Sequence, residues 1–368
     1  MYSKKEYFKH SIFFIITFIA TTLAGGEWLY GRSVLSTEKP LTWEYFFLSM
    51  QYSIPFVGIL LVHELGHLFT AIHHKVKVSL PFFIPAWFGS LAPSIGTFGA
   101  VIHMKGLIGS RKKFFDIGVA GPLVGFVLAF IVLWYGFTTL PEAGFIYEIH
   151  PEYADPNYQA PENGEAMDLH LGYNLLFWLM EKILADESRM PNMSEVIHYP
   201  YLFAGYLALF FTALNLLPIG QLDGGHVIFG LFPKHHKTIS LLAYSAFLFY
   251  AGLGVVTPFE ELNYLLFAIP FYIGFIYICF RKANLPTQTK WMIALIMVAL
   301  QYAVVGLFPS LEGYSGWLFF AFLVGRVLGI QHPDVMDGRP LSSNKKILGW
   351  IAILIFILCF TPQPFMIS

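Results

Sequence analysis

Apolar runs long enough to cross a lipid bilayer recur along the whole chain. A helix that crosses a hydrocarbon core of roughly 30 Å needs about 20 mainly apolar residues. Nine stretches approach that length, near residues 11–26, 44–72, 116–138, 199–217, 238–256, 262–280, 290–308, 314–330 and 346–362. The pattern predicts an all-α polytopic membrane protein with about nine transmembrane helices. We interpret the first run as a retained span, because no Ala-x-Ala-like cleavage site closes it.

One apolar segment has the wrong composition for a helix. Residues 80–104 contain three prolines and three glycines, and proline removes a backbone donor and breaks helices. Non-helical backbone at membrane depth must be buried in protein or line a wet cavity. We therefore expect a small re-entrant β-hairpin or loop beside the second span.

Composition agrees with a protein whose partner is the lipid bilayer. Hydrophobic residues make up 56% of the chain and charged residues only 12%, against about 25% charged in soluble domains. The net charge is −1, and no basic patch interleaved with aromatics indicates a nucleic-acid partner. Cys279 and Cys359 both sit in apolar runs, where packing is the expected role.

The distribution of basic residues predicts an orientation. With the N-terminus inside, all but four of the 22 Lys and Arg residues, hence 18, fall in cytoplasmic segments or at a cytoplasmic helix end. The positive-inside rule predicts this bias. We therefore expect the N-terminus inside and, after nine spans, the C-terminus outside. The expected location is a prokaryotic cytoplasmic membrane.

A long acidic segment follows the third span. Residues 139–198 carry eleven acidic and two basic residues and are expected to form an extracytoplasmic loop. Within it, residues 169–184 are apolar enough to form a helix against the membrane surface. A tenth span is the alternative, although His170 and Glu181 interrupt the run.

The second span contains an HExxH motif, His63-Glu64-Leu65-Gly66-His67. Residues i and i+4 share one helix face, so His63 and His67 can present two imidazoles to one zinc ion while Glu64 reaches a water molecule as a general base. HExxH also arises by chance. However, three ionisable residues inside an apolar span call for a functional reason, and a catalytic zinc site needs a third protein ligand.

A second polar constellation lies at the end of the fourth span, in NLLPIGQLDGGH at 215–226. Pro218 and the glycines should end the helix and expose Asp223, which is the natural third ligand. In the predicted topology, Asp223 and His67 lie at similar depth. Asn215 is a candidate donor to the oxyanion of a reacting carbonyl, or alternatively an amide that only packs between helices.

Four motifs in order resemble those of the site-2 protease family of intramembrane zinc metalloproteases. They are HELGH at 63–67, GTFGA at 96–100, FDIGVAGPLVG at 115–125 and NLLPIGQLDGGH at 215–226. Residues 332–350 are similar to the C-terminal portion of a prokaryotic and plastid branch of the family. No PDZ-like module is visible near 139–198, so no PDZ-mediated partner is expected.

The resemblance implies one Zn²⁺ per chain, bound by His63, His67 and Asp223, with Glu64 as catalytic base and Asn215 supporting the carbonyl. It also implies that an edge formed by Gly96, Thr97, Phe98 and Gly99 binds unwound substrate. The substrates would be single-span membrane proteins, cleaved in regulated intramembrane proteolysis.

The chain is expected to divide into three stretches. An N-terminal span and loop (1–43) precede a catalytic membrane core (44–230), and a membrane domain of about five spans (231–368) follows.

Two other classes of protein remain open. Buried His, Glu and Asp also mark ion pathways in metal or proton transporters, and a catalytically silent binding protein is a third possibility. Hydrolysis needs a base beside a metal ligand, whereas transport does not, so the His-Glu-x-x-His order favours the protease. For residues 94–100, the alternative to a strand edge is a structural plug packed against the second span.

Overall fold

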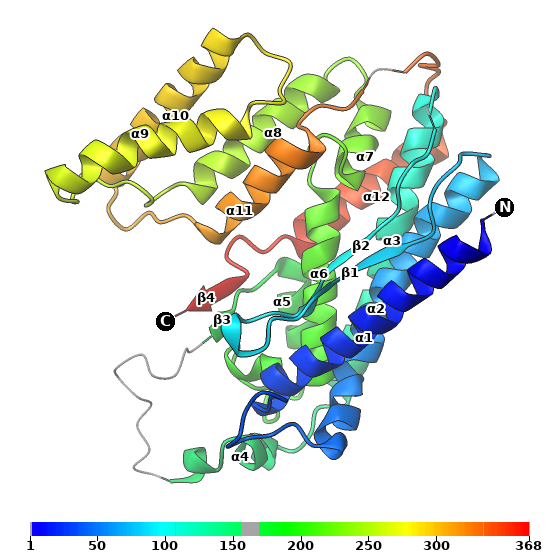
Figure 1. Ribbon diagram of the computed structural model, residues 1–368, viewed down its shortest axis with the longest axis vertical. Helices are drawn as coiled ribbons and strands as arrows, with labels where there is room; N and C mark the ends of the chain where they lie inside the picture. The colour runs from blue at the N-terminus through cyan, green and yellow to red at the C-terminus, as the bar shows by residue number, and fades with distance from the viewer. Residues whose placement is uncertain (1, 107, 156–168, 334, 368) are drawn as a thin grey trace. The chain divides into compact units, whose positions relative to one another are not determined.

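The computed structural model describes all residues except 1, 107, 156–168, 334 and 368 (Figure 1). The chain divides into two compact units. The first comprises residues 1–108, 119–215 and 351–368, and the second comprises residues 109–118 and 216–350. The predicted division into three stretches concerns function and stays a prediction.

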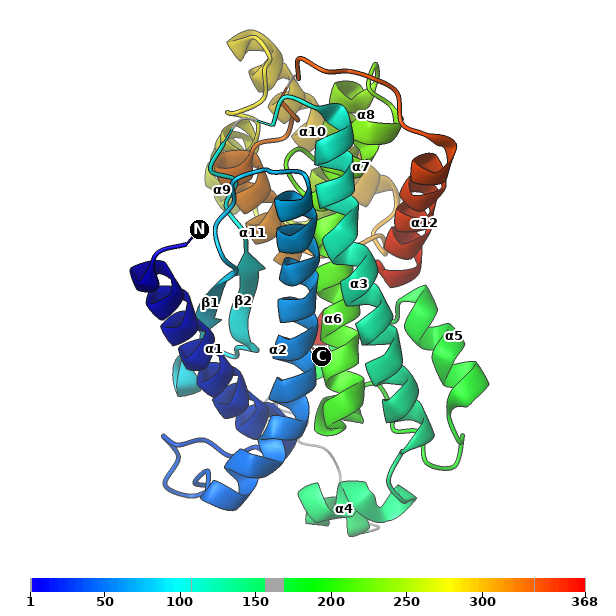
Figure 2. The ribbon, with the colours of Figure 1, turned by 90° about the vertical axis from the view of Figure 1, so that its right-hand side faces the viewer.

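Long helices form the body of the first unit: α1 (Lys4–Tyr30), α2 (Trp43–His73), α3 (Arg111–Thr138, from Val119 onward) and α6 (Pro200–Leu216). They run beside one another in Figure 2. Side-chain caps define the starts of two of them, because Ser3 and Glu6 form a capping box on α1 and Thr42 accepts from the Tyr45 amide on α2.

Stacked aromatic side chains hold α2 against α6. Tyr52 of α2 stacks on Phe203 of α6 with ring centroids 5.2 Å apart, and Phe56 packs on Phe211 at 5.8 Å. Tyr52 is fully buried, and its hydroxyl donates to the carbonyl of Ile95 at 3.1 Å. The same tyrosine therefore fixes the segment that precedes the second strand.

The proline-interrupted segment forms the expected two-stranded hairpin. Strand β1 (Phe82–Ala86) pairs antiparallel with β2 (Gly96–Val101), and the 3-10 turn η1 (Gly89–Leu91) lies between them. A bulge interrupts the register between Phe83 and Pro85. Both strands pack against α1, as Figure 2 shows.

The segment after α3 is built of short elements. They are η2 (Ala143–Phe145), α4 (Ile146–Ile149), η3 (Pro151–Ala154), β3 (Leu169–Leu171), α5 (Leu175–Leu184) and η4 (Glu195–His198). The expected surface helix at 169–184 is thus shorter. Its first three residues form a strand that pairs antiparallel with β4 (Phe365–Ile367), and the ten-residue α5 is too short to be a tenth span.

Apart from an isolated β-bridge between Ser110 and Asp337, the regular structure described in the second unit is helical, and it includes the start of α3 up to Gly118. Its elements are α7 (Asp223–Leu231), α8 (His236–Ala251), α9 (Leu262–Cys279), α10 (Thr287–Leu307), α11 (Gly316–Leu323), the π-helical turn η5 (Val324–Leu328) and the first half of α12 (Ser343–Cys359). Tyr244 of α8 donates to the carbonyls of Cys279 and Ala321, and so joins three helices.

Each of the nine predicted spans coincides with a helix. Among the described residues, however, only five helices are long and apolar enough to cross a membrane, namely α1, α2, α3, α9 and α10. Helix α6 and the α11–η5 segment are apolar but shorter, and α8 and α12 have 16 and 17 residues. A membrane protein is supported, whereas the count of nine spans is not confirmed.

Candidate metal centre

The HExxH motif lies two turns before the end of α2, as expected. His63, Glu64 and His67 are all buried, with exposed fractions of 5 to 6%. The two imidazoles lie on one face of the helix, and their Nε2 atoms are 3.0 Å apart. Two nitrogens at about this separation suit one tetrahedral ion, since zinc–nitrogen bonds of about 2.0–2.1 Å place two ligand atoms roughly 3.3 Å apart.

Helix α3 makes room for both imidazoles with glycines. A Cβ built on Gly121 would lie 2.2 Å from Nε2 of His67, and one on Gly125 would lie 3.2 Å from Cβ and Nδ1 of His63. Gly66 of α2 makes the reciprocal approach, because its Cβ would lie 2.9 Å from the carbonyl oxygen of Ala120. The four-residue spacing of Gly121 and Gly125 matches that of the two histidines.

These glycine contacts explain a stretch whose role the sequence did not reveal. The sequence identifies FDIGVAGPLVG, residues 115–125, as one of four family motifs, but it does not place Gly121 or Gly125 beside the two histidines. The available signal was the spacing, since two glycines four residues apart on one helix can face two histidines four residues apart on another.

Asn215 lies beside the histidine pair, near the end of α6. Its Nδ2 is 3.4 Å from Nε2 of His63, and the side chain is half-buried. An amide N–H therefore points toward the histidine pair, as a donor to a reacting carbonyl would. The same contact also packs α6 against α2, so both interpretations of Asn215 stand.

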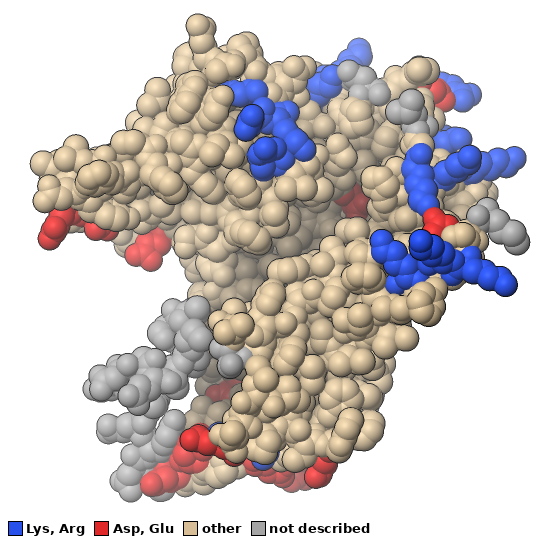
Figure 3. Space-filling model, viewed as in Figure 1, with Lys and Arg blue, Asp and Glu red and all other residues tan. Residues whose placement is uncertain are grey.

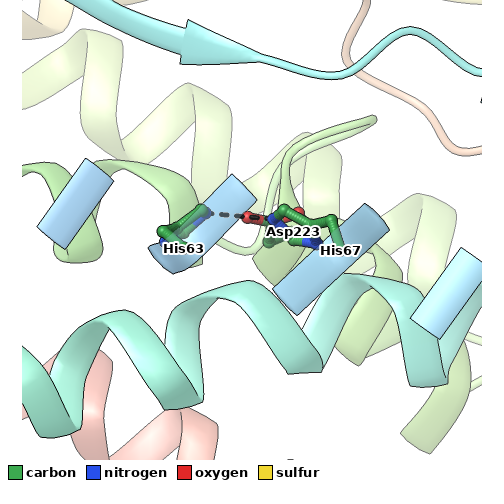
Figure 4. Close-up of side chains that lie close together, drawn as sticks. All are labelled: His63, His67 and Asp223. Atoms are coloured by element: carbon green, nitrogen blue, oxygen red, sulfur yellow. Dashed lines mark hydrogen bonds between the residues drawn. The ribbon is translucent and has the colours of Figure 1, made fainter. Parts of the chain in front are cut away.

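Asp223 is the first residue of α7, in the second unit. Helix α6 ends at Leu216, and the chain turns through residues 217–222, where Gly220 has a φ of +53°. The turn folds α7 back on the end of α6, since a Cβ on Gly224 would lie 2.0 Å from the Leu216 carbonyl oxygen. The helix break predicted at Pro218 is therefore present. Figure 4 draws Asp223 together with His63 and His67.

The predicted substrate-binding residues all lie on β2, with different surroundings. A Cβ on Gly96, whose φ is +87°, would lie 2.2 Å from Cα of Thr21, so the backbone that approaches Gly96 is that of α1. The Thr97 side chain is buried and its hydroxyl donates to the Ile84 carbonyl within the hairpin. Phe98 is exposed, and a Cβ on Gly99, whose φ is +98°, would lie 3.4 Å from the ring of Phe211 on α6.

The placement of Gly96 changes one expectation. Gly96 was expected to admit a substrate backbone, but the close approach is already used inside the protein. Phe211 lies four residues before Asn215, one helical turn away, so Gly99 remains beside the element that carries Asn215.

Comparison with known proteins gives consistent matches. Residues 51–259 match peptidase family M50. The chain is 31% identical over 278 residues to the probable zinc metalloprotease EGY1, chloroplastic, of Oryza sativa subsp. japonica. The matched stretch covers 71% of this chain and 42% of that protein. It is 33% identical over 188 residues to the protein of the same name from Arabidopsis thaliana, covering 51% of this chain and 30% of that protein.

A second type of relative matches over a similar stretch. The probable zinc metalloprotease EGY2, chloroplastic, of Arabidopsis thaliana is 28% identical over 195 residues, which cover 51% of this chain and 31% of that protein. The chain thus spans less than half the length of these relatives.

Proposed function

We propose that this chain, which belongs to peptidase family M50, the site-2 protease family, is an intramembrane zinc metalloprotease that hydrolyses peptide bonds of transmembrane substrates. The observation that carries the proposal is the buried pair His63 and His67, with Glu64 next to the first of them on an apolar helix. Burying these groups in a membrane span is costly, so a role that needs them is the simplest reason for their presence.

The residues fit a zinc ion. Two neutral imidazoles and one carboxylate form a donor set that zinc accepts, and the Nε2 atoms of His63 and His67 already face one another. Asp223 is the proposed third ligand, and Figure 4 draws the proposed set. The sequence supports it, since Asp223 follows Asn215 by eight residues in one motif and Asn215 lies 3.4 Å from His63.

Zinc bound there would lower the pKa of water toward about 7 and polarise the scissile carbonyl. Glu64 would accept the proton from the attacking water and return it to the leaving amine. Asn215 would donate its amide N–H to the carbonyl oxygen as negative charge develops. The burial of all three helix residues, His63, Glu64 and His67, keeps bulk solvent from these steps.

Substrate would be held in an extended form along β2. A helical substrate hides its carbonyls in its own hydrogen bonds, so it must be locally unwound before cleavage. Strand β2 pairs only with β1 in its sheet among the described residues, which leaves its second edge for a substrate strand. The exposed Phe98 lies on that strand, next to Gly99, which packs beside Phe211 of α6.

The substrates proposed are single-span membrane proteins, with the N-terminus of the enzyme inside. Within the first unit, Lys4, Lys5 and Lys9 begin α1 and Lys75 and Lys77 follow α2, whereas the described acidic residues of 139–155 and 169–198 follow the other end of α3. Lys and Arg gather on the upper and right-hand side of the face in Figure 3, and Asp and Glu gather along its lower edge. This separation supports the orientation through the positive-inside rule. The relatives are named chloroplastic and lend no support to a prokaryotic cytoplasmic membrane.

Replacement of Glu64 by glutamine tests the proposal. The amide preserves the shape of the side chain but cannot accept a proton from water, so Glu64→Gln should retain zinc and lose cleavage of a transmembrane reporter by at least about 100-fold, the usual contribution of a general base. The exposed Glu44 of the same helix supplies the control, Glu44→Gln, which should cleave normally. Cleavage by Glu64→Gln at the parental rate would exclude Glu64 as base and favour the transporter.

A further inference from the structure

A second histidine and carboxylate cluster lies far from the HExxH motif, in the first unit. It consists of His150, Glu195 and His198, which each offer a ligand atom within 4.8 Å of the others. His198 reaches the carbonyl of Leu29 near the end of α1, where Tyr30 packs on Tyr45 of α2. Tyr45 precedes His63 by 18 residues, or about 27 Å of helix. The cluster is therefore separate from the candidate metal centre.

The hydrogen bonds of the two histidines decide which ring nitrogens carry protons. Nδ1 of His198 lies 2.8 Å from the Leu29 carbonyl oxygen, and Nδ1 of His150 lies 3.0 Å from a carboxylate oxygen of Glu152. Both partners can only accept, so each Nδ1 must donate. In the neutral rings, both Nε2 atoms then carry lone pairs.

Those two lone pairs face one another. The Nε2 atoms of His150 and His198 are 3.1 Å apart, and a carboxylate oxygen of Glu195 lies 3.5 Å from the Nε2 of His198. Two lone pairs at this distance repel unless a cation lies between them, and a carboxylate beside them attracts one. The HExxH pair has the same arrangement, with its Nε2 atoms 3.0 Å apart.

The cation between the rings is either a proton or a metal ion. Burial lowers the pKa of His198 to about 4, with its proximity to His150 acting in the same direction. The geometry of three ligand atoms within 4.8 Å of one another favours a metal ion, because a proton can be shared by only two of them. Histidine ligands whose other nitrogen donates to a carbonyl or carboxylate are the usual arrangement around protein-bound zinc.

Tyr153 fixes two of the three groups. Its ring stacks on His150 with centroids 4.7 Å apart and planes 14° apart, and its hydroxyl donates to Glu195 Oε1 at 3.1 Å. Glu195 and His198 are three residues apart on η4, so they share one face. The side chains of His150 and Glu195 are thus held in place by contacts with Tyr153.

An adjacent cavity leaves room for a further ligand. A pocket of about 280 Å³ is lined by Tyr153 and Glu195, among others. It is large enough for water molecules, and zinc takes four ligands in most protein sites. Water from this pocket can supply the fourth position.

We propose that His150, Glu195 and His198 form a second divalent-metal site, with zinc as the cation that the two imidazoles and one carboxylate select. The site would join three distant parts of the chain, because His150 follows α4, His198 precedes α6, and His198 is anchored on α1. It would stabilise the acidic segment against these helices. The expected content of the whole chain then rises from one zinc ion to two.

Zinc content of the full chain in detergent tests the proposal, after loading with zinc chloride and desalting. The parent should hold about two zinc ions, one for each ligand group. His150→Phe keeps the stacking on Tyr153 but lacks Nε2, and should hold about one. The double variant His63→Ala, His67→Ala should also hold about one zinc ion. The triple variant, which adds His150→Phe to these two, should hold almost none. His73→Ala, at an exposed histidine, is the control and should match the parent.

Cobalt provides a second measurement that does not depend on proteolysis. In the His63→Ala, His67→Ala background, added Co²⁺ should give the visible absorption of a low-symmetry site, and Glu195→Gln in that background should weaken it. Absence of zinc and cobalt from that background, or two zinc ions in His150→Phe, would overturn the second site. The catalytic proposal would survive either result, since it depends on His63, His67 and Glu64.

Discussion

Gly121 offers a test of how the proposed zinc ligands are positioned without altering any of them. A Cβ at this position would lie 2.2 Å from Nε2 of His67, and 2.5 and 2.6 Å from two ring carbons. Real Cβ contacts do not fall below 3.0 Å, so Gly121→Ala must move the imidazole or α3 by at least 0.8 Å. Metal–ligand distances tolerate only about 0.2 Å.

This displacement sets the size of the expected effect. Changes that disturb the support of a metal ligand cost about 10–100-fold in metal affinity or activity, and a 1 Å error in a reacting group can cost about 100-fold. We therefore expect Gly121→Ala to lower zinc affinity about 10–100-fold and to lower cleavage by a similar factor. The helix propensity of alanine, up to about 1 kcal/mol better than that of glycine, should offset part of the roughly 1–3 kcal/mol that the overpacked contact costs in stability.

Two further glycines provide a graded comparison. Gly125→Ala should have a smaller effect, since its Cβ would lie 3.2 Å from His63. Gly58→Ala on α2 should be neutral, because nothing lies within 4 Å of its Cβ. Zinc titration, reporter cleavage and thermal unfolding in detergent would be measured for all three. Parental zinc affinity and cleavage in Gly121→Ala would refute the proposed role of α3.

Three other outcomes follow from the proposed centre and topology. His67→Ala and Asp223→Ala should each lose the catalytic zinc, measured as metal content in a His150→Phe background, and full occupancy would disprove the ligand assignment. Gly99→Val should retain zinc yet cleave helical substrates poorly, with a milder defect for substrates that are unstructured at the scissile bond. An equal loss of cleavage for helical and unstructured substrates would favour the alternative that residues 94–100 are a structural plug. Cysteines engineered in the 139–198 segment should react only with reagent added outside, and labelling from the cytoplasmic side alone would reverse the orientation.

The sequence was most informative where function depends on local geometry. Helical spacing alone places His63 and His67 on one face, and Pro218 alone ends α6 near Leu216. The proline and glycine content of residues 80–104 was likewise sufficient to predict a hairpin. These features follow from backbone chemistry within a few residues of one another.

Features that depend on distant segments could not be read from the pattern. The fit of Gly121 against His67 and the packing of Gly96 on Thr21 need two elements placed together. The pairing of Leu169–Leu171 with Phe365–Ile367 joins parts of the chain nearly 200 residues apart, and a short apolar strand is hard to distinguish from the start of a helix. His150 and His198 are 48 residues apart in the chain, with no motif to connect them.

The β3–β4 pairing has a consequence for synthesis of the protein. Residues 351–368 belong to the first unit, and Pro364 accepts from the Tyr206 hydroxyl of α6 at 2.8 Å. At about 5–20 residues per second, a ribosome that has finished α6 needs roughly 7–27 s to make residues 216–350 before it reaches these residues. During this interval the nascent first unit has β3 without its partner strand. The first unit therefore cannot complete its β3–β4 pairing until the intervening helices have been synthesised.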